Sequence, residues 1–170
     1  MRPVVLLIVS TICVVPGRVA AQAHDGHQRA AAHDDSAFRA MQSRGQRVMG
    51  VDQYTSIHHF ASLPDGGRIE LQRDRDDSAG TAAIRTHLRT IARAFADGDF
   101  GAPFAVHQDS VPGVPVMRQR RSAIEYVVTD LPRGAELRIR TVDPAALDAI
   151  HRFLAYQRRE HRTEQALHAH

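Results

Sequence analysis

Two segments of the chain alternate apolar and polar residues around a Pro-x-Gly turn, which is the pattern of a β-hairpin. The first segment, residues 63–71, has the sequence LPDGGRIEL, and the second, residues 131–139, has the sequence LPRGAELRI. The leucine, proline and glycine of the first segment each recur in the second segment at the same separation along the chain, that of Leu63 from Leu131. We call this separation the hairpin offset. The two segments therefore predict two hairpins of similar construction.

Apolar residues at helical spacing follow each hairpin, which predicts one amphipathic helix after each. The apolar positions are Ile84, Leu88, Ile91 and Phe95 in the first helix and Ile150 and Leu154 in the second. Ile84 and Ile150 are separated by the same number of positions as Leu88 and Leu154. We call this separation the helix offset. Asp143-Pro144 is a typical N-cap and first helical residue. We expect a duplicated ββα-ββα plan, an α+β domain whose antiparallel sheet carries both helices on one face.

Less regular segments lie outside the two hairpin-helix units. A short helix is expected from about Asp35 to Arg47, before the first hairpin. The segment 98–113, rich in proline and glycine, joins the two units, and a short helix around Met117 follows it. We expect a single domain over residues 36–162 and a flexible carboxyl terminus over residues 163–170.

The amino terminus has the pattern of an export signal. Arg2 precedes an apolar run, Val4 to Val15, that is too short to span a bilayer, and small residues predict cleavage after Ala21 or Ala23. Residues 1–21 are thus expected to be a signal peptide and residues 22–35 a flexible His/Asp-rich tail. The mature chain should be exported, either periplasmic or secreted, with no membrane span.

Composition limits the chemistry of the mature chain. The signal peptide contains Cys13, the only cysteine, so any metal ligand must be nitrogen, oxygen or thioether. Removal of Arg2 and Arg18 lowers the formal net charge from +3 to +1. Nucleic-acid binding needs a concentrated basic face, and the arginine runs here are interpreted as solvated helix faces, so no nucleic-acid partner is expected.

Histidine is unusually frequent, with eleven residues in 170, and imidazole is the commonest protein ligand of transition metals. At the hairpin offset, His58 and Phe60 correspond to Tyr126 and Val128, an apolar alternation expected to face the helices. His58 should therefore point toward the helices, and His59 toward the opposite face of the sheet.

Further histidines follow along the chain. His87 lies at the edge of the first apolar stripe, and His161 aligns with Phe95 at the helix offset, within the second stripe. His107 is expected in a loop that could fold over them, whereas His151 should lie on a helix flank. Met49 and Met117 could add a thioether for copper. The candidate metal ligands are His58, His59, His87, His107 and His161.

A second candidate metal site lies in the amino-terminal tail, at His24, His27 and His33. Cleavage after Ala21 would place His24 third, where an amine, two amides and an imidazole supply four nitrogens suited to Cu(II) or Ni(II). Cleavage after Ala23 would make His24 the first residue, so that amine and imidazole chelate together. The tract also fits a merely soluble, disordered lead-in.

From Arg44 onward the chain resembles a group of small exported bacterial proteins. The likeness lies in residues 44–53, Thr55, 58–60, 95–100, His107, Pro112-Gly113, Phe153-Leu154 and His161. Members of such groups can carry an aspartate carbamoyltransferase label, but that resemblance would require a Ser-Thr-Arg-Thr phosphate loop and a longer chain, and neither is present. The resemblance implies no particular activity.

Three classes of function stay open. The favoured one is a periplasmic transition-metal-binding protein, with copper preferred and zinc as the alternative, acting in capture, buffering or resistance. An enzyme is the second: a serine hydrolase is disfavoured because no serine has the glycines of a nucleophile elbow, and a metal hydrolase because no HExxH pair occurs. Metal-dependent catalysis through the strand of His58 and His59 stays open. Homo-oligomerisation stays open for every class, and the third class is a small-ligand, haem or protein-binding module at the junction of the repeats. Its pocket residues would be Tyr54, Phe60, Phe104 and Tyr126.

Overall fold

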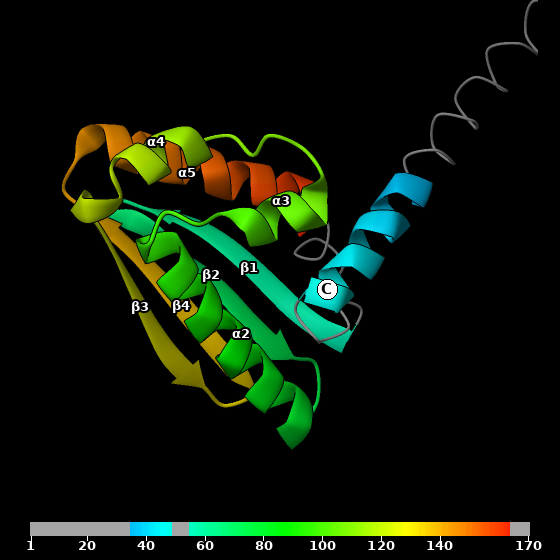
Figure 1. The fold of residues 1–170 in the computed structure, drawn as a ribbon. Helices are drawn as coiled ribbons and strands as arrows, with labels where there is room; N and C mark the ends of the chain where they lie inside the picture. The colour runs from blue at the N-terminus through cyan, green and yellow to red at the C-terminus, as the bar shows by residue number, and fades with distance from the viewer. Residues whose placement is uncertain (1–34, 49–54, 164–170) are drawn as a thin grey trace, which may run out of the picture. The chain divides into compact units, whose positions relative to one another are not determined.

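A computed structural model describes residues 35–48 and 55–163 of the chain. Its centre is a four-stranded antiparallel sheet with the strand order β1-β2-β4-β3 (Figure 1). The strands are β1 (Ser56–Leu63), β2 (Gly66–Arg73), β3 (Ile124–Leu131) and β4 (Gly134–Thr141). The α+β prediction with an antiparallel sheet is confirmed. The bounds of β3 and β4 follow those of β1 and β2 at the hairpin offset seen in the sequence.

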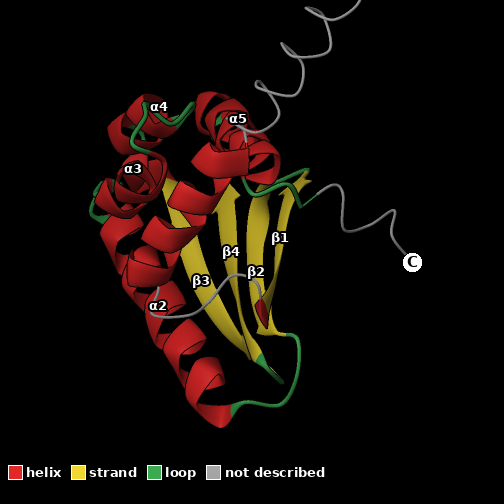
Figure 2. Ribbon diagram, turned by 90° about the vertical axis from the view of Figure 1, so that its right-hand side faces the viewer, coloured by secondary structure: helices red, strands yellow, loops and turns green. Residues whose placement is uncertain are grey.

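The helices lie on one face of the sheet, as Figure 2 shows. They are α2 (Ser78–Ala96), α3 (Gly101–His107), α4 (Val114–Gln119) and α5 (Pro144–Glu160), and a further helix spans residues 35–48. The helices expected before the first hairpin and around Met117 are present. The expectation of a loop at His107 was wrong, because His107 is the last residue of α3. No helix in the described residues has the length and apolarity to cross a membrane.

Two-residue turns join the strands of each hairpin, since Leu63 pairs with Gly66 and Leu131 pairs with Gly134. Both glycines lie where the central strands β2 and β4 approach closely. A Cβ on Gly134 would lie 1.9 Å from the carbonyl oxygen of Leu71, and one on Gly66 would lie 2.1 Å from that of Ile139. Only glycine fits at these two positions, which explains why the Pro-x-Gly pattern occurs in both hairpins.

The core lies between the sheet and the helices. Alternate strand residues face it, including Phe60, Ile69, Leu71, Ile124, Ala135, Leu137 and Ile139. The helix stripes face them with Ile84, Leu88, Ile91, Phe95, Ala146, Ile150, Phe153 and Leu154. Each helix packs mainly on the hairpin of the other half, α2 on β3 and β4 and α5 on β1. Neither ββα segment therefore buries its own apolar face by itself.

Two equivalent side chains tie each helix to the opposite hairpin. Arg85 of α2 donates hydrogen bonds to the carbonyl oxygens of Leu131 and Gly134, at 2.7 and 3.0 Å. His151 of α5 corresponds to Arg85 at the helix offset, and its Nε2 lies 3.0 Å from the carbonyl oxygens of Leu63 and Gly66. Asp143 caps α5 as expected, accepting hydrogen bonds from the backbone N–H groups of the first turn.

The helix over residues 35–48 contacts α3 and the segment that follows α5. Nε of Arg44 donates to the carbonyl oxygen of Val106 in α3 at 2.7 Å. The guanidinium of Arg162, just beyond α5, stacks on the ring of Phe38 at 4.3 Å. Met41 is buried. These contacts join the amino-terminal helix to α3 and to the end of α5.

Arg85→Ala should destabilise the fold by about 1 to 3 kcal/mol, because it leaves two hairpin carbonyls without their donor. Arg89, one turn further along α2, is the control. It forms an exposed ion pair with Asp130, so Arg89→Ala should cost less than about 1 kcal/mol. Urea unfolding measures both values, and equal losses would contradict the role assigned to Arg85.

Candidate metal centre

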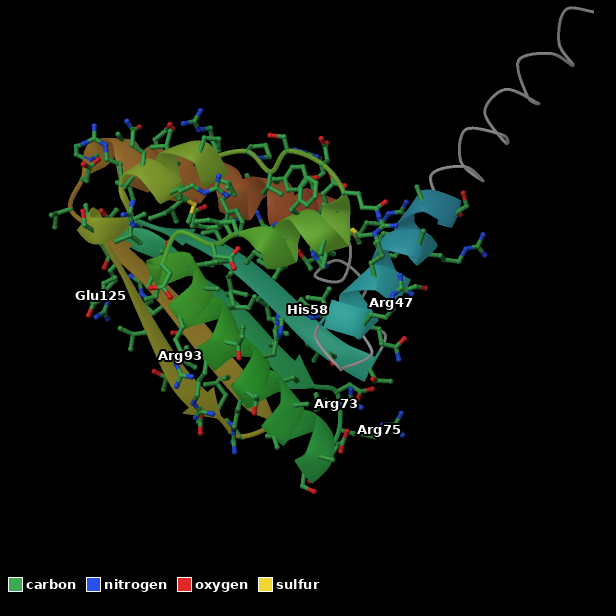
Figure 3. The ribbon with its side chains drawn as sticks, viewed as in Figure 1. Arg47, His58, Arg73, Arg75, Arg93 and Glu125 are labelled. Atoms are coloured by element: carbon green, nitrogen blue, oxygen red, sulfur yellow. The ribbon has the colours of Figure 1, made fainter. Side chains whose placement is uncertain are left out.

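Four histidines from four elements line one pocket between the sheet and the helices. They are His58 of β1, His87 of α2, His107 of α3 and His161, the residue that ends α5. We call this the imidazole pocket. Its volume is about 80 Å³, and the rest of the described lining is apolar apart from Gln157. Figure 3 labels His58, whose side chain lies on the helix-covered side of the sheet, as strand alternation predicts.

Three of these rings are in contact. The ring centroids of His58 and His161 are 5.8 Å apart, with their planes tilted by 43°. Those of His107 and His161 are 5.3 Å apart and nearly perpendicular, at 87°. His161 therefore lies between the other two rings. The fold thus brings together at the sheet-helix interface four of the five histidines singled out as ligands from the sequence.

Hydrogen bonding to Gln157 engages one nitrogen of His107 and leaves the other without a partner among the described residues. Nε2 of His107 lies 3.1 Å from Oε1 of Gln157, which is 5% exposed. With the Gln157 amide in this orientation its oxygen accepts the hydrogen bond, so Nε2 carries the proton and Nδ1 keeps its lone pair. Nδ1 of His107 and Nε2 of His58 are both buried with no hydrogen-bond partner among the described residues. Two imidazole nitrogens are thus removed from water without a hydrogen-bond partner in the described part of the chain.

Burial keeps the pocket imidazoles neutral. Desolvation, reinforced by the nearby His87, lowers the pKa of His58 from 6.5 to about 4. Desolvation also lowers the pKa of His87 to about 4 and holds the pKa of His161 well below 6.5. Burial lowers the pKa of His107, although its hydrogen bond to Gln157 opposes the shift. Neutral imidazole is the form that binds metal ions, so all four rings are in that form at neutral pH.

The other residues singled out from the sequence lie elsewhere or outside the described residues. His59 lies on the opposite face of the sheet from the pocket, beside Arg68 and Glu70, so it does not join the other candidate ligands. Met117 is buried in the core without lining the pocket, and Phe104 is exposed. Phe60 lines the pocket, whereas Tyr126 packs against Phe95. The residues outside the described ranges are His24, His27, His33, Met49, Tyr54 and the whole signal segment.

The rings are close but not arranged as a preformed metal site. Within residues 35–48 and 55–163, no three histidine, cysteine, aspartate or glutamate side chains are positioned to hold an ion as they stand. The rings of His58 and His107 each lie close to the ring of His161, but the three side chains are not placed to hold an ion together. Coordination needs a rotation of the side chains.

The other half of the chain shows what these positions hold when packing alone decides. His58 corresponds to Tyr126 at the hairpin offset, and His161 corresponds to Phe95 at the helix offset. The rings of Tyr126 and Phe95 are 5.9 Å apart, close to the 5.8 Å between His58 and His161. An aromatic pair thus fills the equivalent space without imidazoles. Packing does not require histidine at His58 and His161.

Gln157 is the functional candidate that sequence reasoning missed. At the helix offset it corresponds to Ile91, an apolar position of the first helix. A buried glutamine on a stripe that is apolar in the other helix was the available signal. No sequence pattern indicated that Val48 would line the pocket, because its place there depends on how the helix over residues 35–48 packs.

The chain was compared with protein-family models, curated proteins and solved structures, and no match was found in any of the three comparisons.

Acid should destabilise the protein through the imidazole pocket. The unfolded chain takes up protons at these histidines below about pH 6.5, whereas the folded chain resists protonation until about pH 4. Stability should therefore be complete above pH 6.5 and fall as the pH drops from there toward 4.

Thermal unfolding between about pH 7.5 and pH 5 measures this loss. The double variant His58→Tyr/His161→Phe, which copies the Tyr126–Phe95 pair, should show a shallower decline. A decline of the same slope in the variant would show that the pocket is not its source.

Proposed function

We propose that this chain is an exported metal-binding protein that holds one transition-metal ion in the imidazole pocket through His58, His107 and His161. The observation that carries the proposal is the convergence of these three neutral rings, from different elements, at a position where Nε2 of His58 and Nδ1 of His107 are buried with no partner among residues 35–48 and 55–163. Buried polar atoms in proteins nearly always have a partner. A metal ion is a partner that three imidazoles can share.

The ring separations support shared coordination. Imidazoles bound to one ion through metal–nitrogen bonds of about 2.0 to 2.1 Å, at tetrahedral angles, have ring centroids about 5 Å apart. The observed separations are 5.3 and 5.8 Å. After rotation of the rings, His161 is close enough to each of the other two rings to share an ion with it. Gln157 supports His107 in the way that outer hydrogen bonds orient metal-binding histidines.

The size of the imidazole pocket favours an ion over an organic ligand. Pockets for drug-sized molecules and cofactors measure about 300 to 1,000 Å³, whereas this one measures about 80 Å³. Haem would need the helices to separate from the sheet. Metal capture or buffering is therefore the better supported of the functions expected from the sequence.

Copper is the preferred ion and zinc the alternative. The described lining of the pocket contains no thiol or thioether, so the ligands are imidazole nitrogens, which suit both Cu²⁺ and Zn²⁺. Affinities for one set of ligands rise toward copper in the divalent series, which favours Cu²⁺ when both ions are present. Export, and a second site at His24, His27 and His33, complete the proposal on the sequence evidence alone.

We also infer that the two ββα halves arose by duplication. The constant offsets, the equivalent glycines Gly66 and Gly134, and the crosswise contacts of Arg85 and His151 support this inference. On this basis one half has the aromatic pair Tyr126 and Phe95 where the other has the imidazoles His58 and His161.

The mature chain should bind one Cu²⁺ or Zn²⁺ in the imidazole pocket. His24, His27 and His33 are first replaced by alanine, so that the tail contributes no imidazole. In this background His58→Tyr/His161→Phe should weaken binding at least about 100-fold, because two ligands are lost. Isothermal titration of protein purified without an affinity tag measures the affinity.

His59→Ala is the matched control, since His59 lies on the other face of the sheet. It should leave the affinity unchanged. Circular dichroism confirms that the variants are folded. Equal affinity in the parent and in the double variant would refute the assignment of the ligands.

Gln157→Leu should weaken metal binding by about 10- to 100-fold, because His107 loses the acceptor that fixes its tautomer. Gln119→Leu, an exposed change on α4, serves as the control. Competition titration with a chromogenic chelator measures both variants. An unchanged affinity for Gln157→Leu would mean that His107 binds no metal or needs no orientation.

A further inference from the structure

The second face of the sheet carries no helix of the described residues, as Figure 2 shows. We call it the open face. The two central strands place four charged side chains on it, Arg68 and Glu70 from β2 and Glu136 and Arg138 from β4. These positions alternate with the core residues of the same strands. The open face therefore has a charged centre, and we call the four residues the charged quartet.

Like charges are direct neighbours across the central strands. In the register of β2 and β4, Arg68 lies opposite Arg138 and Glu70 lies opposite Glu136. Like charges directly opposite each other destabilise a sheet. Arg68 is shared by the two carboxylates, at 3.4 Å from Glu136 and 3.9 Å from Glu70, whereas Arg138 is paired with Asp65. The charged quartet thus has a positive end and a negative end along the strands.

A second copy of the chain complements this arrangement. When two open faces meet about a two-fold axis that runs across the strands, the strand direction is reversed between the copies. The positive end of one charged quartet then lies over the negative end of the other, so each arginine faces a glutamate of the second copy. A two-fold interface requires a surface that is complementary to itself in this way. The charges that are alike within one copy become opposite between two.

Apolar side chains and the size of the open face also fit a second copy. Ile57 of β1 and Val127 of β3 flank the charged quartet on the outer strands, with exposed fractions of 44% and 37%. Four strands of eight residues, about 4.8 Å apart and rising about 3.3 Å per residue, present about 500 Å². Two copies would bury about 1,000 Å², at the lower end of specific interfaces. The dimer should therefore be weak.

We infer that the open face of the sheet binds the open face of a second copy, forming a symmetric dimer in which Arg68 and Arg138 of each copy pair with Glu70 and Glu136 of the other. The imidazole pocket lies on the opposite side of the sheet, so this inference does not depend on the proposed function.

Sedimentation equilibrium of the mature chain tests the inference, with a chelator present so that no metal ion links the copies. At low salt the dissociation constant of the dimer should lie in the range of about 1 to 100 μM. NaCl at about 0.5 M should weaken the dimer at least about tenfold, because salt screens the pairs during association. A chain that stays monomeric at a concentration of about 1 mM would overturn the inference.

Charge reversal identifies the interface. Glu70→Lys/Glu136→Lys makes the charged quartet wholly positive, and Arg68→Glu/Arg138→Glu makes it wholly negative. Each variant alone should be monomeric, because like charges then face each other between the copies. An equimolar mixture of the two should form dimers again. A mixture that stays monomeric, or single variants that dimerise as the parent does, would overturn the assignment of the open face.

Two further variants provide the controls. Arg89→Glu/Arg152→Glu reverses two exposed arginines on the helices, with the same change of net charge as the wholly negative quartet, and should leave the dimer unchanged. Glu70→Gln/Glu136→Gln keeps the size of the side chains and should weaken the dimer at least about tenfold. Circular dichroism establishes which variants are folded. If the reversed variants do not fold, the glutamine variant decides, and its dimerisation at the parent's affinity would overturn the inference.

Discussion

At the imidazole pocket, the burial of histidine rings conflicts with the hydrogen bonding that their nitrogens require. Folding removes His58, His107 and His161 from water to close the sheet against the helices, yet leaves Nε2 of His58 and Nδ1 of His107 without partners in the described part of the chain. A polar atom buried in this way costs about 1 to 3 kcal/mol. The Tyr126–Phe95 pair fills the equivalent space in the other half, where the Tyr126 hydroxyl is also buried without a partner among the described residues. The metal ion proposed above would supply the partner that Nε2 of His58 and Nδ1 of His107 lack among the described residues.

The architecture places the pocket where four elements meet. Each helix packs on the hairpin of the opposite half, and Arg85 and His151 secure that crosswise arrangement through hairpin carbonyls. The carboxyl-terminal end of α5 thereby comes over β1, which brings His161 to His58. The joining segment adds α3, whose last residue is His107. The ligands thus lie far apart in the sequence, and only the completed fold brings them together.

Much of this arrangement could be predicted from the sequence, because it follows from periodicity. Alternation in the strands placed His58 inward and His59 outward, and the helix offset placed His161 on the buried stripe of α5. The helix at His107 was missed, since proline and glycine in its surroundings favour a loop and tertiary contacts decide otherwise. The contact between Gln157 and His107 joins residues far apart in the sequence, and no local pattern encodes such a pairing. The orientation of ring nitrogens is likewise a matter of side-chain packing.

X-ray absorption spectroscopy of the copper- or zinc-loaded chain tests the central claim most directly, because it reports the ligands themselves. The account predicts a nitrogen and oxygen shell at about 2.0 to 2.1 Å with the outer scattering of about three imidazole rings. That scattering should disappear in His58→Tyr/His161→Phe with the tail histidines replaced. A spectrum without imidazole scattering, or one that the double variant leaves unchanged, would contradict the account.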